Sequence, residues 1–360
     1  MFQRRFPLPA AAAAVAAALL VPAAASCGSP AAESTLAAPI APGRTAYPLT
    51  LDNCGHKVVF TRPPRRVLIL NGTSVGEAQS FVMLGLQRHV LANAQSYAVW
   101  DDPSIGAAVK ALPRGGLTNN RYFEVPAEQV LAARPDLVVS HWSGGFDARK
   151  GLATREQLAA AGIATLVNPV NCAYGKPDAT AAEKRARRQA SIASSYEFLR
   201  LLGRVFDVQD RAERVVTDLR RRLDAVRAAT AGRPPKKVLI AYPGMTMMNA
   251  DGLPAVWTGR VADEVVRAAG GVNAFEGLAP EAVATINKEQ LAAARVDVLV
   301  VGLFSSDEDP AAEARALFTA YPQWRASQTG TYTTVADGVF LGPLNALAAE
   351  KLAKVVQPGA

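Results

Sequence analysis

Short apolar segments alternate with segments of helical periodicity along most of the chain. Strands are predicted at the apolar runs, residues 66–70, 90–94, 137–140, 165–167, 237–241, 296–301 and 338–341. Helices are predicted between them, at residues 74–86, 127–133, 154–161, 261–269, 311–320 and 346–356. Such alternation indicates an α/β fold with doubly wound parallel sheets, because both faces of a parallel sheet are covered by helices.

Two stretches depart from this alternation. Residues 47–60 alternate around a turn at Asp52-Asn53-Cys54-Gly55, which predicts a hairpin. Residues 182–231 carry no strand signal, and their apolar positions recur at helical spacing. A second helix within this stretch is expected to start with Asp207 as its cap and to end near residue 229. The basic residues 184–188 are expected to form a solvated helix face.

A twelve-residue pattern occurs twice in the chain. Residues 128–139 and 289–300 are identical at seven of the twelve positions, and each copy predicts a helix, a tight turn and a buried strand. A repeat of this kind points to repeated structural units. The sequence therefore predicts two similar α/β lobes on either side of a long helical segment.

Composition and the first residues indicate an exported globular protein. The chain has 360 residues, of which 50% are hydrophobic and 19% charged, which excludes a disordered or fibrous protein. The net charge of +8 is not concentrated in a stripe, so nucleic-acid binding is not expected. Arg4 and Arg5 precede an uncharged, alanine-rich run, which predicts a signal peptide at residues 1–26.

The end of this run, Ala24-Ala25-Ser26-Cys27, resembles a bacterial lipobox, so Cys27 is expected to carry a lipid anchor in the membrane. Two acyl chains on one cysteine would anchor the protein stably. Residues 27–45 are then a flexible tether, because they are small, polar and interrupted by proline. The alternative is ordinary cleavage and a soluble exported protein.

The other two cysteines, Cys54 and Cys172, form an even pair in an exported chain, where a disulfide is the default. The loop that it would close is worth about 4–5 kcal/mol on the chain-entropy model. His56, His89 and His141 are isolated from one another in the sequence. We therefore expect no metal site built by the protein and no cofactor.

Residues 72–76 read Gly-Thr-Ser-Val-Gly, a formal match to the nucleophile motif of serine hydrolases. A secreted hydrolase using Ser74 is thus one alternative. Against it, only a tether and a hairpin precede the motif, whereas a hydrolase of this class needs earlier sheet strands and an oxyanion loop. The simpler interpretation is a strand-to-helix loop in which Ser74 is the helix N-cap.

Aromatic and polar side chains follow the predicted strands. The candidate ligand-binding residues are Tyr97, Trp100, Arg121, Tyr122, His141, Trp142, Tyr242, Trp257 and Phe304. Ligands of doubly wound sheets bind at the carboxyl ends of the strands. Two such edges would form a cleft lined by aromatic rings and a few polar groups.

Several ordered segments together resemble the class III periplasmic binding proteins, the substrate-binding components of ABC importers for ferric siderophores, haem and cobalamin. They are Tyr47-Pro48-Leu49-Thr50, residues 52–55, 64–67 and 84–86, both copies of the repeat, and Gly270-Gly271-Val272-Asn273. The resemblance covers nearly the whole mature chain. It implies an N-terminal lobe at residues 46–181, an inter-lobe helix at 182–205 and a C-terminal lobe at 206–360, and it supports pairing of Cys54 with Cys172.

The resemblance also implies a function without bond chemistry. The chain would be a monomeric receptor on the outer face of the cytoplasmic membrane that captures a ferric siderophore and delivers it to an ABC permease. Glu128 and Glu289, at the start of each repeat, match the glutamates by which the family docks on its permease. Both could equally be ordinary first-turn glutamates, which a helix dipole favours.

Haem or cobalamin are the alternative ligands. Haem would need an axial Tyr or His, for which His141 is the candidate histidine. The tryptophan that cobalamin binders often carry before the second docking glutamate is missing, since residues 282–286 contain none.

Overall fold

The computed structural model describes residues 43–359, apart from residues 73, 96–100, 279–282 and 337–341. The predicted signal peptide, Cys27, most of the tether, Tyr97, Trp100 and the predicted strand at 338–341 lie outside the described residues. Within them, no helix is both long enough and apolar enough to span a bilayer.

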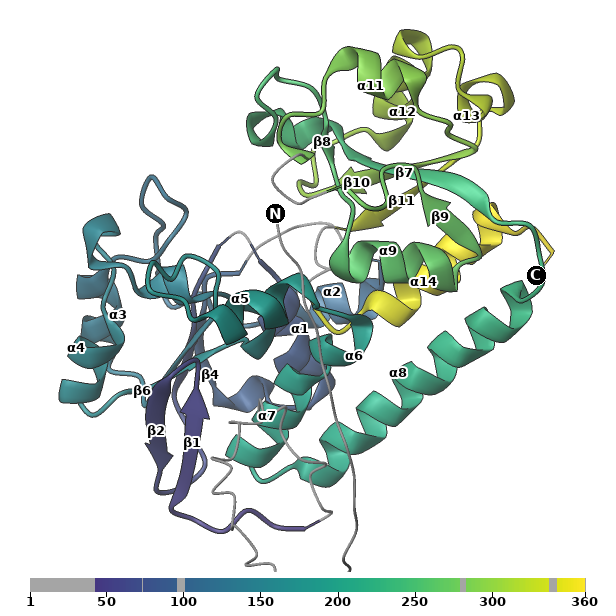
Figure 1. Cartoon of the computed structure of the whole chain (residues 1–360). Coiled ribbons are helices and arrows are strands. Elements are labelled where there is room, and N and C mark those ends of the chain that lie inside the picture. Colours follow the sequence, from purple (N-terminus) through teal and green to yellow (C-terminus); the bar gives the residue numbers. More distant parts are fainter. Residues whose placement is uncertain (1–42, 73, 96–100, 279–282, 337–341, 360) are drawn as a thin grey trace, which may run out of the picture. The chain divides into compact units, whose positions relative to one another are not determined.

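The first lobe contains a four-stranded parallel sheet in the order β4-β3-β5-β6. Figure 1 labels its two outer strands, β4 and β6. Its strands are β3 (Val67–Ile69), β4 (Val90–Asn93), β5 (Leu137–Ser140) and β6 (Ala164–Val167). Its helices are α1 (Gly76–Met83), α2 (Pro103–Lys110), α3 (Ala127–Ala133) and α4 (Arg155–Ala160). From β3 the chain continues to β4 on one side of it and then to β5 on the other side, as the sequence predicts for a doubly wound sheet. The topological switch point of the sheet therefore lies beside β3.

Before this sheet comes the predicted hairpin of β1 (Leu49–Asn53) and β2 (His56–Phe60), which pair in antiparallel register. Cys54 and Gly55 form its turn with positive φ angles of 59° and 80°. Short 3-10 helices complete the description of both lobes: η1 (Gln87–His89), η2 (Ser143–Phe146), η3 (Ala148–Lys150), η4 (Pro169–Asn171) and η5 (Pro243–Met248).

The second lobe contains a five-stranded sheet in the order β11-β10-β7-β8, in which β9 also pairs with β7. Its strands are β7 (Lys236–Tyr242), β8 (Ala255–Val256), β9 (Gly271–Asn273), β10 (Val298–Leu303) and β11 (Tyr332–Ala336). Its helices are α9 (Arg260–Ala268), α11 (Lys288–Ala293), α12 (Pro310–Ala320), α13 (Arg325–Thr329) and α14 (Asn345–Val356). All pairs are parallel except β7 with β8.

The stretch from 182 to 205 is not one helix. It contains most of α5 (Ala181–Arg188), together with α6 (Ile192–Ser195) and α7 (Glu197–Val205). The helix breaks because Ser191 is extended and caps the backbone N–H of Ser194 with its side chain. The longest helix among the described residues is α8 (Gln209–Thr230), which packs on α7 and also on α9 and α14. The lobe boundaries given above stay predictions.

Asp207 does not cap α8, contrary to the prediction. The N-cap is Val208, which makes no side-chain capping bond. Asp207 adopts a positive φ of 56°, and its Oδ1 accepts a hydrogen bond of 2.6 Å from the backbone N–H of Thr45 instead. The Asp207 carboxylate thus bonds to Thr45, which is distant in the sequence, and not to a backbone N–H group in the first turn of α8.

The sequence repeat is a repeated structural unit. In the first copy, the Asp136 carboxylate accepts hydrogen bonds of 2.8 Å from the backbone N–H groups of Arg65 and Arg66, just before β3. In the second copy, Asp297 Oδ2 accepts one of 2.8 Å from the N–H of Lys237 in β7. Each aspartate therefore holds the first residues of the neighbouring central strand, which explains why it is identical in both copies.

A disulfide joins Cys54 and Cys172, as predicted, with their Cα atoms 5.0 Å apart. Arg155 reinforces the same connection between the hairpin and β6. Its guanidinium, on a side chain that is almost fully buried, donates to the backbone oxygens of Asn53 and Thr165 and to both of their side chains, at 2.7–3.2 Å. Burial lowers the pKa of Arg155 to about 10.

Candidate functional site

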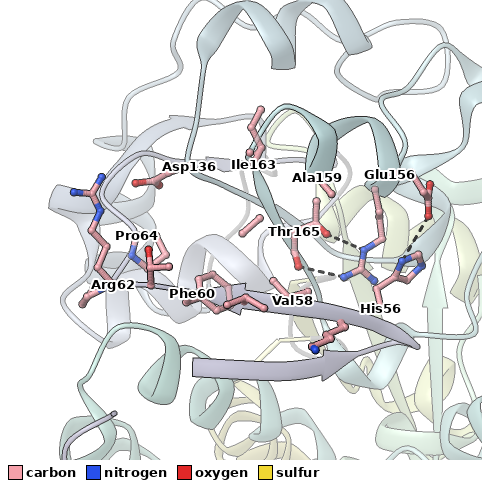
Figure 2. Close-up of a pocket in the computed structure, with 17 residues that line it drawn as sticks. His56, Val58, Phe60, Arg62, Pro64, Asp136, Glu156, Ala159, Ile163 and Thr165 are labelled. Atoms are coloured by element: carbon pink, nitrogen blue, oxygen red, sulfur yellow. Dashed lines mark hydrogen bonds and ion pairs between the residues drawn. The ribbon is translucent and has the colours of Figure 1, made fainter. Parts of the chain in front are cut away.

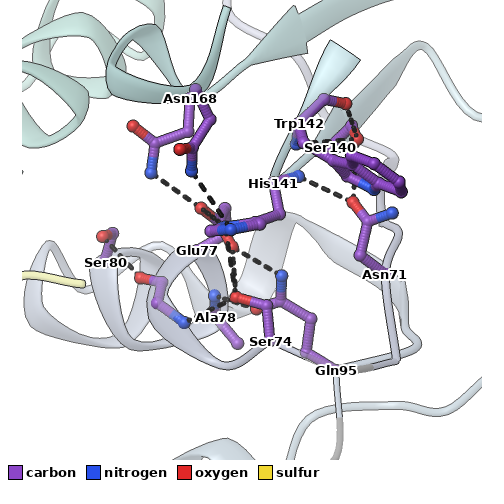
Figure 3. A network of polar contacts seen from close by, with 12 residues as sticks. Asn71, Ser74, Glu77, Ala78, Ser80, Gln95, Ser140, His141, Trp142 and Asn168 are labelled. Atoms are coloured by element: carbon purple, nitrogen blue, oxygen red, sulfur yellow. Dashed lines mark hydrogen bonds and ion pairs between the residues drawn. The ribbon is translucent and has the colours of Figure 1, made fainter. Parts of the chain in front are cut away.

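Polar side chains gather at the carboxyl ends of the four strands of the first sheet. Asn71 follows β3, Gln95 follows β4, His141 follows β5 and Asn168 follows β6. The last three converge on the carboxylate of Glu77 in α1 (Figure 3). The sequence therefore places a polar network at the sheet edge where ligands of this fold class bind.

The Glu77 side chain is completely buried and fully hydrogen-bonded. Its Oε1 lies 3.1 Å from Nδ1 of His141 and accepts from the Asn168 amide at 2.7 Å. Its Oε2 accepts from Gln95 at 2.7 Å and from the Ser74 hydroxyl at 2.9 Å. Burial alone would raise the pKa of Glu77, but the charge of His141 and these hydrogen bonds outweigh it and lower the pKa to about 2.

The arrangement of Ser74 does not fit a hydrolase. A catalytic triad needs the serine on one histidine nitrogen and the acid on the other. Here Ser74 Oγ lies 3.3 Å from Nδ1 of His141, the same nitrogen that meets Glu77, while Nε2 faces the Asn171 amide at 3.1 Å. Ser74 is also not the N-cap of α1, contrary to the simpler interpretation, because Val75 holds that position and the hydroxyl binds Glu77.

His141 is equally poorly placed as an axial ligand for haem. It is 7% exposed, and both of its ring nitrogens already lie within hydrogen-bond distance of protein groups. An axial role would require the ring to leave both partners.

A second buried carboxylate fixes the ring of Trp142. Glu124, only 3% exposed, accepts hydrogen bonds from the Asn71 amide and, at 3.0 Å, from the Trp142 indole N–H. Burial raises the pKa of Glu124 in spite of these bonds. The indole is thus oriented by a carboxylate from the segment before α3, which is itself bonded to Asn71 at the end of β3.

Trp142 belongs to a row of alternating cations and aromatic rings. The ammonium of Lys150 lies 4.5 Å from the centre of the Trp142 ring, and that ring lies 4.5 Å from the ring of Tyr174. The guanidinium carbon of Arg187, in α5, lies 3.9 Å from the centre of the Tyr174 ring. We call these four residues the cation–aromatic row. Cations on ring faces at such distances are attracted by the ring quadrupole.

Arg260, the first residue of α9, is electrostatically coupled to the end of this row. Burial lowers the pKa of Arg187, and the charge of Arg260 lowers it further. Burial likewise lowers the pKa of Arg260, which also interacts with Tyr174. Among the described residues, neither arginine forms an ion pair with a carboxylate. Two partly desolvated cations near one another therefore lack a counter-ion from the described part of the protein.

The remaining predicted ligand residues differ in their placement. Arg121 and Tyr122 are exposed and contact each other, with the guanidinium 2.8 Å from the phenol oxygen. Tyr242 has no exposed surface, so it packs in the core, with its ring 5.6 Å from Trp257. Trp257 and Phe304 are partly buried, and Trp257 lines a small pocket together with Arg260.

The sequence prediction omitted Lys150, Tyr174, Arg187 and Arg260. Tyr174 follows β6 and η4, so the rule that selected the other strand-end aromatics could have found it. Arg187 lies in the basic segment that was expected to be a solvated helix face. Its neighbours Lys184, Arg185 and Arg188 are exposed as expected. Of these four basic residues, only Arg187 is partly buried, and its guanidinium lies against the ring of Tyr174.

A cavity of about 460 Å³ lies elsewhere in the first lobe, between β2 and the α4–β6 segment (Figure 2). It reaches Asp136 and Ala164, at the amino ends of β5 and β6. Its buried cation, Arg155, already has protein acceptors for its hydrogen bonds. This cavity is therefore a weaker candidate for the ligand site than the opposite sheet edge.

Glu128 and Glu289 occupy corresponding places in the two lobes. Each lies in the first turn of its helix, α3 or α11, and each is exposed. The described residues contain no cluster of three or more His, Cys, Asp or Glu side chains that could hold a metal ion.

One known protein family matches more than half of this chain. The family model described as "Periplasmic binding protein" matches residues 74–314. A search of curated protein sequences finds no match.

Solved structures with this fold include iron and haem transport proteins. One is an ABC-type Fe3+-hydroxamate transport system from Saccharomonospora viridis, with 24% identity and a TM-score of 0.63, covering 88% of this chain and 100% of that one. Another is a periplasmic haem-binding protein from Pseudomonas aeruginosa, with 25% identity and a TM-score of 0.55, covering 82% and 94%. A third is a periplasmic haem-binding protein from Roseiflexus sp., with 20% identity and a TM-score of 0.56, covering 81% and 97%.

Proposed function

We propose, from the premise that this chain belongs to the periplasmic binding protein family, that it captures a ferric siderophore and delivers it to an ABC permease. The family consists of extracytoplasmic substrate-binding proteins of importers, and the fold of the chain is that of its iron- and haem-binding members. The choice of a siderophore within this family is the part that the site residues must support.

The observation that carries the proposal is the pair Arg187 and Arg260. Both are partly buried, and no described carboxylate neutralises either. A ligand with anionic oxygens would supply the missing counter-charge through charge-assisted hydrogen bonds. The rings of Tyr174 and Trp142 beside them offer apolar surface for the organic shell of such a ligand.

Iron itself would be held by the siderophore. Because a siderophore provides all the oxygen ligands of its ferric ion, its receptor needs cations and aromatic walls rather than metal-ligating side chains. The cation–aromatic row has this chemistry. The proposal requires no bond chemistry from the protein.

Haem is the second candidate, and Tyr174 favours it. A partly exposed phenol next to a guanidinium could serve as an axial oxygen ligand, while Arg187 and Arg260 would meet the propionates. His141 does not support this alternative, since its ring nitrogens are engaged. Cobalamin has no comparable supporting contact among the described residues.

Ligand titrations separate these candidates. The exported form would be titrated with ferric hydroxamate, ferric catecholate, hemin and cobalamin while tryptophan fluorescence is followed. We expect saturable quenching by a ferric siderophore, weakened about tenfold or more in Arg187→Ala and Arg260→Ala, with Arg185→Ala as the exposed control on the same helix. Saturable binding of hemin with a shifted Soret band, lost in Tyr174→Phe, would replace the siderophore by haem.

Docking on the permease is proposed to use Glu128 and Glu289. Two exposed carboxylates at equivalent positions of similar lobes could each meet a basic residue on a two-fold symmetric permease. Glu128→Ala with Glu289→Ala should abolish uptake and leave ligand affinity unchanged. Asp178→Ala with Asp251→Ala, which removes two other exposed carboxylates, is the matched control. Loss of ligand affinity in the glutamate variant would argue against docking.

Export and anchoring are proposed from the sequence of residues 1–27. Cleavage before Cys27 and diacylation would leave the protein on the outer face of the cytoplasmic membrane. Mass spectrometry of the protein from membranes should find the lipid on Cys27, and Cys27→Ser should release the protein into the soluble fraction. An unmodified N-terminus inside the alanine-rich run would instead mean ordinary cleavage.

A further inference from the structure

A second cluster of cations lies at the amino ends of the strands in the first lobe, opposite to the edge that carries the candidate ligand site. Arg65 precedes β3, and Arg88 and His89 precede β4. With Arg62 and Arg211 they line a pocket of about 360 Å³, whose floor includes the buried ring of Phe206. We call it the arginine pocket.

The arginine pocket contains no acidic residue in its lining. Its four arginines are exposed, and within the described part of the chain none of them forms an ion pair. The nearby carboxylate of Asp136 is occupied by the backbone N–H groups of Arg65 and Arg66. Asp136 keeps its negative charge, but the four guanidinium groups around this pocket outnumber it and give the pocket a net positive potential.

Two of these arginines are held in place. Arg211 donates a hydrogen bond of 2.6 Å to the backbone oxygen of Leu84, at the end of α1. Arg88 donates to Nε2 of His89 at 3.2 Å, while Nδ1 of that ring lies 2.8 Å from the Pro64 carbonyl. A preorganised set of guanidinium donors matches the geometry of phosphate oxygens better than a set of mobile lysines does.

The tether joins the folded body beside this pocket. Thr45 is bound to the corner between α7 and α8: its backbone N–H donates to Asp207, its hydroxyl donates to the Arg204 carbonyl, and the hydroxyl accepts from Gln209. The same corner supplies Phe206 and Arg211 to the arginine pocket.

The chain between this corner and the proposed lipid on Cys27 is short. A flexible tether, as the sequence predicts for residues 27–45, would give the intervening residues 28–42 a root-mean-square span of about 20 Å. An anchored protein would thus keep the arginine pocket close to the bilayer surface, where anionic lipids attract basic clusters.

We propose that the arginine pocket binds the phosphate of anionic phospholipid headgroups and holds the anchored protein on the membrane between encounters with the permease. The proposal rests on the exported, lipid-anchored state described above. Because the pocket and the candidate ligand site lie at opposite ends of the same strands, this contact would leave the ligand site facing away from the membrane. The receptor would then have to release the lipids in order to dock.

Vesicle binding tests this proposal on the exported chain from residue 28 onward, without its lipid. We expect co-sedimentation with phosphatidylcholine vesicles that contain phosphatidylglycerol, and none with phosphatidylcholine alone. Arg62→Gln with Arg88→Gln should weaken the binding about 30-fold, since each basic residue near the surface contributes about 1 kcal/mol. Arg185→Gln with Arg188→Gln, which changes the net charge equally on exposed positions of α5, should weaken it much less.

Equal losses in the two double variants would overturn the proposal, because the attraction would then be a property of net charge alone. Binding of inorganic phosphate in the pocket, with no preference for the anionic vesicles, would overturn it in favour of a site for free phosphate. Arg65→Gln with Arg211→Gln provides a second test if the first variant does not fold. Ferric siderophore titration of the same variants keeps the two proposals apart, since it should be unaffected by the loss of lipid binding.

Discussion

Replacing Glu77 by Gln should strongly destabilise the first lobe, and by an amount that depends on pH. The folded protein holds the Glu77 carboxylate without solvent exposure, on donors from Ser74, Gln95, His141 and Asn168. The variant keeps the shape of the side chain but removes its charge. It also introduces an amide NH2 group where other amides already donate, so that donors face donors.

The magnitude follows from linkage between proton binding and folding. The network lowers the pKa of Glu77 from 4.5 to about 2, which corresponds to about 3 kcal/mol of stability. Because the folded pKa is the lower one, this contribution is complete above pH 4.5. It is lost as the pH falls from 4.5 towards 2, where the folded state also takes up the proton.

Urea unfolding followed by circular dichroism at pH 7 and pH 3 is the assay. We expect Glu77→Gln to lower the free energy of unfolding by about 3 kcal/mol at pH 7, and the difference from the unmodified protein to shrink at pH 3. Glu156→Gln, at an exposed glutamate on α4, should change it by less than about 1 kcal/mol at either pH. A Glu77→Gln difference that is the same at both pH values would refute the reasoning.

Further predictions concern the connections that hold the sheets. Cys54→Ser with Cys172→Ser should lower the free energy of unfolding by about 5 kcal/mol, from the 118-residue separation of the cysteines, whereas reductant should no longer affect the variant in thermal melts. Arg155→Met should lower it by about 3 kcal/mol in urea titrations, because two buried backbone oxygens lose their donor; an unchanged midpoint would contradict this. Asp136→Ala should destabilise more than Asp297→Ala in the same assay, since Asp136 accepts two backbone N–H groups and Asp297 one; the reverse order would count against equivalent roles.

The sequence predicted the strands that are continuous apolar runs because their signal is local, but it did not predict β8, β9 or β11. Buried parallel strands are uninterrupted apolar runs, so β5 and β7 stand out without reference to the rest of the chain. The repeat added long-range information, because each of its two copies contains an aspartate at the same position followed by a buried strand, β5 in the first copy and β10 in the second. Helix termini were less predictable: Asp207 has the right side chain for a cap, but its hydrogen bond goes to Thr45, which is 162 residues away.

The candidate site was only partly predictable for a similar reason. His141 and Trp142 were found because they directly follow a strand. The partners that decide their roles come from elsewhere: Glu77 from α1 for His141, and Tyr174 from the segment after η4 for Trp142. No pattern along the chain indicates that a ring and a guanidinium separated by many residues will stack.

The polar groups at the candidate site are of two kinds: those whose hydrogen bonds are satisfied within the protein, and those that remain available to a ligand. The polar network around Glu77 satisfies its own donors and acceptors, so a ligand would gain little by breaking it, and its effect is to fix the strand ends and the Trp142 loop. Arg187 and Arg260 instead keep hydrogen-bonding capacity and charge that the described carboxylates do not use. Ligand selectivity should therefore follow the charge and spacing of the ligand's anionic oxygens, and a neutral chelate of the same size should bind more weakly than an anionic one. Comparing such a pair of ferric chelates in the unmodified protein and in the double variant Arg187→Ala with Arg260→Ala would test this. The preference for the anionic chelate should disappear when both arginines are removed, and it should persist if the network around Glu77 selects the ligand.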